Sequence, residues 1–149
     1  MELGGTTWIV AADGAEARVF EERVRAGEVR EVSDFHMKAD GHDWPTAHRH
    51  PATAHESAGF GRHGAGGRDP ADEAERRFLR RVAAELDAAA ARKAFDSLVI
   101  MAPPRALGVL KAELTPALAR KLEASEAHER VGEGAEAIRH HLRDLRARA

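Results

Sequence analysis

The stretch Phe95-Asp96-Ser97-Leu98-Val99-Ile100-Met101-Ala102-Pro103-Pro104 decides the fold class of this chain. Its apolar run is closed by two prolines, which neither continue a central strand nor fit a helix interior. A continuous apolar run of this length, following a predicted helix, is typical of a strand that is buried on both faces. We therefore expect residues 95–102 to form a central strand of a sheet that is covered by helices.

Three β-rich segments near the N-terminus predict an antiparallel meander. Residues 6–11 are rich in β-branched and aromatic residues and end at the turn dipeptide Asp13-Gly14. Residues 17–21 alternate in polarity and form the expected return strand of a hairpin. After a second turn at residues 25–28, residues 29–35 supply a third strand.

Helical periodicity dominates the rest of the chain. A long helix is expected from Ala71 to Lys93, with Asp69 as N-cap and Pro70 as its first residue. Shorter helices are expected at residues 105–114, 115–122 and 136–148, whereas residues 123–134 show no clear period. This order predicts a single α/β domain over residues 1–149, with a mixed sheet and helices packed on its faces.

A glycine-dense segment, Gly59 to Arg68, leads directly into the long helix. Glycine allows a backbone to approach a ligand closely, and Arg62, His63 and Arg68 add hydrogen-bond donors and positive charge suited to an anion. The segment is the C-terminal part of residues 37–68. This longer stretch has no hydrophobic period, and we expect it to be flexible without a partner. The alternative is a surface loop that binds nothing.

Four arginines flank the apolar stripe of the long helix, namely Arg76, Arg77, Arg80 and Arg81. Beside the glycine-dense segment they are candidates for contacts with RNA phosphates. Asp72 and Glu73 precede Arg76 and Arg77 by four residues, so an ordinary solvated face with helix-surface ion pairs is the alternative.

Composition excludes several function classes. The chain has no cysteine, so it has neither disulfides nor a thiolate metal site, and its net charge of −2 confines any nucleic-acid binding to a local patch. The histidines of residues 37–68 offer no helical His-x-x-x-His pair, so we expect no metal site and no cofactor. The first residues resemble no signal peptide and no run is long enough to span a bilayer, so we expect a cytoplasmic protein without a membrane partner.

Two blocks of the sequence resemble the bacterial host-attachment protein family, whose members are relatives of the archaeo-eukaryotic peptide release factors. The first block is Trp8 to Gly14 together with Ala17 to Phe20, and the second is Phe95 to Leu110, where a strand, two prolines and Leu-Gly-x-Leu occur as a unit. The resemblance implies the fold of the release-factor central domain, which is similar to that of ribonuclease H.

The loop of that domain reads roughly His-Gly-x-Gly-Gly-Gln, and residues 63–68 resemble it, with Arg77-Phe78 following in the helix. In release factors this loop enters the peptidyl-transferase centre and helps water to attack the peptidyl-tRNA ester. Arg68 stands in the place of the glutamine, and a guanidinium only donates hydrogen bonds. The resemblance therefore implies binding at the ribosome or to tRNA without hydrolysis.

We accordingly expect a non-catalytic module whose contact residues for RNA are Arg62, His63, Gly66, Gly67, Arg68, Arg76, Arg77, Arg80 and Arg81. Two alternatives remain open. One is a hydrolase of an ester or phosphodiester with His63 as general base. The other is an interaction protein involved in attachment to host cells.

Overall fold

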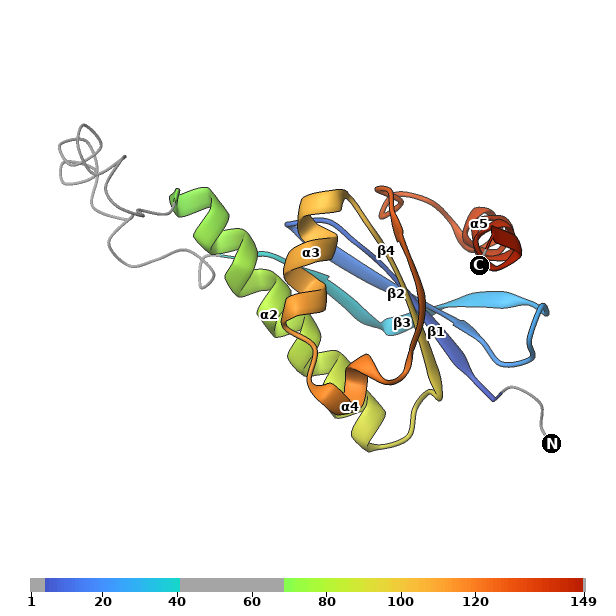
Figure 1. The fold of residues 1–149 in the computed structure, drawn as a ribbon. Coiled ribbons are helices and arrows are strands. Elements are labelled where there is room, and N and C mark those ends of the chain that lie inside the picture. Colours follow the sequence, from blue (N-terminus) through green and yellow to red (C-terminus); the bar gives the residue numbers. More distant parts are fainter. Residues whose placement is uncertain (1–4, 41–68, 149) are drawn as a thin grey trace, which may run out of the picture.

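The computed structural model describes residues 5–40 and 69–148 (Figure 1). Along the chain the elements are β1 (Thr7–Ala12), β2 (Glu16–Glu22), β3 (Val29–Lys38), α2 (Pro70–Ala91), β4 (Ser97–Ala102), α3 (Pro104–Ala112), α4 (Pro116–Ala119), β5 (Leu122–Ala127) and α5 (Ala135–Arg148). The predicted α/β class is thus confirmed, and the described strands form one sheet.

The sheet is mixed and has five strands in the order β3-β2-β1-β4-β5. The meander β1-β2-β3 is antiparallel, as predicted, whereas β4 runs parallel to both β1 and β5. Leu98, Val99 and Ile100 of β4 have no exposed surface. The apolar run that starts at Phe95 therefore forms an interior strand, as its composition predicts.

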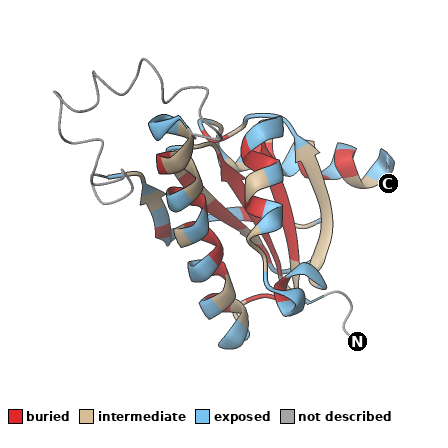
Figure 2. Cartoon of the chain, turned by 60° about the vertical axis from the view of Figure 1, so that its left-hand side comes forward, coloured by how far each residue is buried: buried red, intermediate tan, exposed pale blue. Residues whose placement is uncertain are grey.

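Helices cover both faces of this sheet (Figure 1). Helices α2, α3 and α4 lie on one face, where Phe78, Val82 and Leu86 pack against Trp8 and other strand residues. Of the described helices, α5 alone lies on the other face, and it buries its own apolar stripe there. Figure 2 shows the result, in which buried strands run behind helices whose outer faces are exposed.

The stripe of α5 consists of Ile138, Leu142 and Leu145, as its spacing predicts. Trp8 is 3% exposed, stacks on Phe95 at a ring-centroid distance of 4.8 Å and meets Phe35 edge-on. This aromatic group therefore belongs to the core on the face that α2, α3 and α4 cover.

Two expectations at the sheet edges were wrong. The helix expected through Leu122 ends at Ala119, and residues 122–127 form the edge strand β5. This strand is only half buried and is rich in alanine and glutamate, so it carries no strand-like period. Strand β3 also continues to Lys38, which removes residues 37–38 from the predicted loop. Residues 41–68 lie outside the described part of the chain, so the expectation for them stays a prediction.

Candidate nucleic-acid interface on helix α2

The N-terminus of α2 is built as its sequence predicts. Asp69 is the N-cap, and its Oδ1 accepts a hydrogen bond of 2.8 Å from the backbone N–H of Ala71, while Pro70 occupies the first turn. Phe78 and Leu79 are fully buried against the sheet. Their burial fixes the rotation of the helix and thereby decides which side chains face outward.

Arg77 and Arg80 are the two arginines that project outward from the N-terminal half of α2. Arg77 Nε donates to Glu73 Oε2 at 3.2 Å, which confirms one predicted i,i+4 pair, and Arg80 Nε lies 3.4 Å from Glu113 Oε1. The two arginine side chains are 44% and 58% exposed. Exposed pairs of this kind contribute about 0–1 kcal/mol, so a phosphate can replace the carboxylate at little cost.

Arg76 and Arg81 occupy the two flanks of the helix. Arg81 Nη2 donates to the backbone oxygen of Lys38 at 3.2 Å, and its guanidinium lies 5.4 Å from the ring centroid of Phe78. Arg76 is half-buried, and its buried Nε has no hydrogen-bond partner among the residues that the structure describes. The four arginines therefore do not form one stripe, and Arg81 also connects α2 to the end of β3.

Two acidic residues near the start of α2, Asp72 and Glu75, are paired with an arginine from another helix. Arg105, at the start of α3, pairs with Asp72 and lies 3.4 Å from Glu75. The hydrogen bond with Asp72 raises the pKa of Arg105 above its ordinary value. The second predicted helix-surface pair, between Asp72 and Arg76, is thus replaced by a pair across helices. Neutralised in this way, the acids repel an approaching phosphate less.

The turn between β1 and β2 lies beside the same end of α2. Asp13 Oδ1 accepts from the backbone N–H groups of Ala15 and Glu16, at 2.8 Å each, so its carboxylate serves the turn. Gly14 contacts Glu75 so closely that a Cβ atom at this position would clash with the carboxylate. Within residues 5–40 and 69–148, no group of three or more acidic or histidine side chains is arranged to hold a metal ion.

Five of the predicted contact residues, Arg62, His63, Gly66, Gly67 and Arg68, lie outside the described residues. The structure places the other four within the first turns of α2, directly after that segment in the chain. That residues 62–68 and the arginines of α2 act together therefore stays a prediction.

A second cationic cluster was missed by sequence reasoning. Arg139 and Arg143 lie on α5 at a spacing of four residues, and the fold brings the β2–β3 turn with Arg25 beside them. The run Arg139-His140-His141-Leu142-Arg143 was the available signal. Positive charge near the end of a helix is ordinarily explained by its C-terminal dipole, so the run alone does not indicate a site.

A family model described as "Protein required for attachment to host cells" matches residues 8–142 of this chain. The chain belongs to this family. The match spans all five strands and most of α5, and it confirms the family resemblance seen in the two sequence blocks. No curated protein matches the chain.

Two solved structures are similar to this family member. One, described as "Archaeal protein", has a TM-score of 0.51 and 12% identity over 89% of this chain and 32% of that chain. The other, the crystal structure of the archaeal translation termination factor aRF1, has a TM-score of 0.49 and 11% identity, also over 89% and 32%. The chain thus spans about a third of these structures, and the first supports the fold alone. In the described ranges, no helix is long and apolar enough to cross a membrane.

Proposed function

We propose that this member of the host-attachment family is a non-catalytic module that binds RNA, on the ribosome or on tRNA, through α2 and the preceding residues 62–68. The observation that carries the proposal is the placement of Arg77 and Arg80. Both project from a helix whose rotation is fixed by Phe78 and Leu79, and among the described residues each forms one ion pair, with Glu73 and Glu113.

The chemistry of this surface suits a polyanion with regularly spaced charges. Arg77 and Arg80 lie one turn apart on α2, so their guanidinium groups reach neighbouring positions on the same side. Each guanidinium binds a phosphate with two parallel hydrogen bonds, which are stronger than the single contacts with Glu73 and Glu113. The attraction is local, because the whole chain carries a net charge of −2.

The residue before the helix cap favours binding over chemistry. Arg68 directly precedes Asp69 and adds a third guanidinium to the pair Arg77 and Arg80. Because it cannot accept a hydrogen bond from water, it does not replace a glutamine that positions water at an ester. We expect no release of peptide from ribosome-bound peptidyl-tRNA, and weaker ribosome association for Arg68→Ala at low salt.

The decisive experiment compares two double variants that lose the same charge. Arg77→Gln/Arg80→Gln removes the outward pair, and Arg92→Gln/Arg120→Gln removes two exposed arginines elsewhere. Arg92 lies roughly 22 Å along the helix from Arg77 at 1.5 Å per residue. Ribosome sedimentation and anisotropy with single-stranded RNA are measured over a series of salt concentrations.

If each outward arginine binds one phosphate, the first variant lowers the slope of log K against log salt by about 1.4, since a single-strand contact contributes about 0.7. The control variant keeps the slope of the unmodified protein. Equal slopes for all three proteins would remove α2 as the contact, and absence of any salt-dependent RNA binding would refute the proposal.

A second candidate is an interaction protein that acts in attachment to host cells, and the family description favours it. It predicts binding to host-cell surfaces that Arg77→Gln/Arg80→Gln leaves unchanged. The hydrolase alternative predicts turnover of an ester or phosphodiester that His63→Ala alone abolishes.

A further inference from the structure

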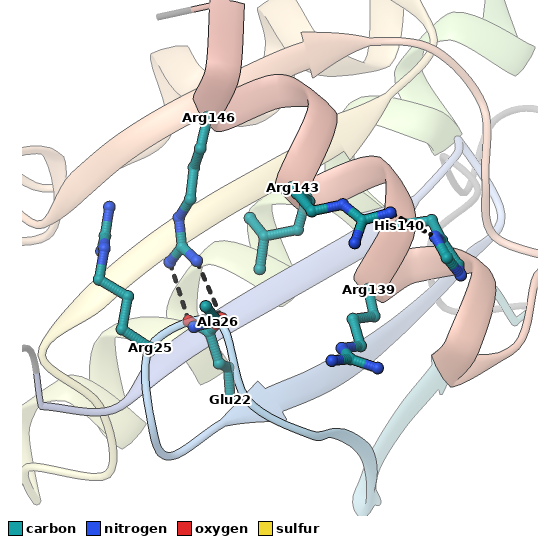
Figure 3. Close-up of a pocket in the computed structure, with 8 residues that line it drawn as sticks. Glu22, Arg25, Ala26, Arg139, His140, Arg143 and Arg146 are labelled. Carbon is teal, nitrogen blue, oxygen red and sulfur yellow. Dashed lines mark hydrogen bonds and ion pairs between the residues drawn. The ribbon is translucent and has the colours of Figure 1, made fainter.

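A cavity of about 280 Å³ lies between the β2–β3 turn and helix α5, on the sheet face opposite to α2 (Figure 3). Its lining includes four guanidinium groups but only one carboxylate. The residues that carry this chemistry are Arg25, Arg139, His140, Arg143, Arg146 and Glu22. Nothing in the family description or in the proposed RNA contact uses this site.

The position of the arginines follows from the burial of α5. Leu142 and Leu145 are buried against the sheet, which leaves Arg139, Arg143 and Arg146 along one flank at spacings of four and three residues. Figure 3 shows Arg146 reaching from the helix to Glu22, beside the turn that carries Arg25, whereas Arg143 extends toward His140. The cavity is therefore walled by basic groups from two segments far apart in sequence.

The one carboxylate in the lining is already occupied. Glu22 is 2% exposed, and its two oxygens accept hydrogen bonds of 2.8 Å each from Arg146 Nη1 and Nη2. Glu22 Oε2 also accepts from the backbone N–H of Ala26 at 2.9 Å, and Ala26 has a φ of 66°. Arg146 and Glu22 thus form a rigid neutral pair, and they do not neutralise the other arginines.

The remaining arginines have weak or shared partners. Arg143 Nη2 donates to His140 Nδ1 at 3.0 Å, so that ring nitrogen acts as an acceptor, and no carboxylate within the described ranges pairs with Arg143. Arg139 lies 3.4 Å from Glu136, whose side chain is 72% exposed. Arg25 shares the carboxylate of Glu123 with Arg146. Positive charge at the cavity therefore exceeds the carboxylate available to it.

We propose that this cavity binds the phosphate group of a small phosphorylated molecule. Guanidinium groups converging from two segments suit an anion that carries several acceptor oxygens and up to two charges. The volume lies just under the usual range for small-molecule sites, which fits a phosphate with a short attached group. Arg139 and Arg143 are the binding residues, and the pair of Arg146 and Glu22 holds the floor in place.

The test uses isothermal titration calorimetry of the full chain with inorganic pyrophosphate and with adenosine monophosphate, at constant ionic strength. The variant is Arg139→Gln/Arg143→Gln, and Arg92→Gln/Arg120→Gln is the control with the same net charge. We expect at least tenfold weaker binding of both probes by the pocket variant, because it loses the charged hydrogen bonds of two guanidinium groups. The control variant keeps the affinity of the unmodified protein.

Two-dimensional NMR of the unmodified protein provides a second readout that does not depend on the stability of a variant. Pyrophosphate is expected to shift the amide resonances of the β2–β3 turn and of α5. No binding of either probe, equal weakening in both variants, or shifts confined to α2 would overturn the proposal.

A parallel titration with single-stranded RNA tests whether the cavity binds a phosphate of RNA and not that of a small molecule. If the pocket variant loses RNA binding and neither small probe binds the unmodified protein, the small-molecule assignment is overturned. The RNA proposal for α2 is tested by different variants, so the two proposals fail independently.

Discussion

Replacing Arg146 with alanine tests how α5 is fastened to the sheet. The guanidinium of Arg146 bonds both oxygens of Glu22 and both oxygens of Glu123, and its Nη2 lies 3.4 Å from Thr7 Oγ1. Burial opposes its charge, but the hydrogen bonds with Glu22 and Glu123 raise the pKa of Arg146 further than burial lowers it. The side chain is therefore charged at neutral pH, and its loss leaves the buried carboxylate of Glu22 without its ion-pair partner.

The expected cost follows from the burial of the two partners. Removing one member of a buried ion pair costs about 3–5 kcal/mol, because the other charge stays desolvated. The Arg146 side chain is 14% exposed and that of Glu22 is 2% exposed, so water reaches the site only from the side of the arginine. We expect a loss of about 3 kcal/mol of unfolding free energy, which corresponds to a fall in Tm of roughly 6–12 °C for a chain of this size.

The assay is urea unfolding at pH 7, with thermal unfolding as a second measurement. Arg148→Ala is the matched control, because Arg148 is 58% exposed and Glu126, its partner at 3.2 Å, keeps a second ion pair with Arg130, so the loss costs about 0–1 kcal/mol. The double variant Glu22→Gln/Arg146→Met removes both charges and is expected to recover most of the lost stability. Equal losses for Arg146→Ala and Arg148→Ala, or no recovery in the double variant, would refute the reasoning.

Two further predictions concern the core and the response to acid. Phe78→Ala empties a fully buried site between α2 and the sheet, and we expect a loss of about 3–5 kcal/mol in urea unfolding; a loss below 1 kcal/mol would show that Phe78 does not anchor α2. Glu126 is desolvated, which raises its pKa, but hydrogen bonds from Arg130 and Arg148 outweigh this and keep its folded-state pKa below the unfolded value. Its contribution to stability is therefore complete above the unfolded pKa and is lost as the pH falls through the folded pKa. Glu126→Gln is expected to reduce the difference in unfolding free energy between neutral and acid pH, and an unchanged difference would contradict this sign.

Several elements could be predicted from the sequence because local patterns specify them. The run from Leu98 to Met101 has an apolar residue at every position, which suits only a strand that is buried on both faces. Asp69 and Pro70 specify the start of α2 through a side-chain cap and a fixed φ. Asp13 specifies its turn because a carboxylate two residues before a backbone N–H bonds to it directly.

Other features were decided only by tertiary structure. Strand β5 exists because Leu122 and Ala124 pair with Leu98 and Val99 of β4, and a half-buried edge strand leaves no period in its own sequence. Asp72 pairs with Arg105 from α3 and not with Arg76, which is closer in sequence. The choice of partner depends on which helix packs beside α2.

The cationic cavity beside α5 is the clearest feature that the sequence alone does not predict. Glu22 and Arg146 are separated by 124 residues, and neither spacing nor composition links them. Sequence by itself determined the secondary structure of this protein wherever one segment buries its own apolar stripe or caps its own end. Charge pairs and the cavity beside them were decided by the tertiary structure, because Coulombic and hydrogen-bond contacts depend on distances that only the packing of separate segments creates.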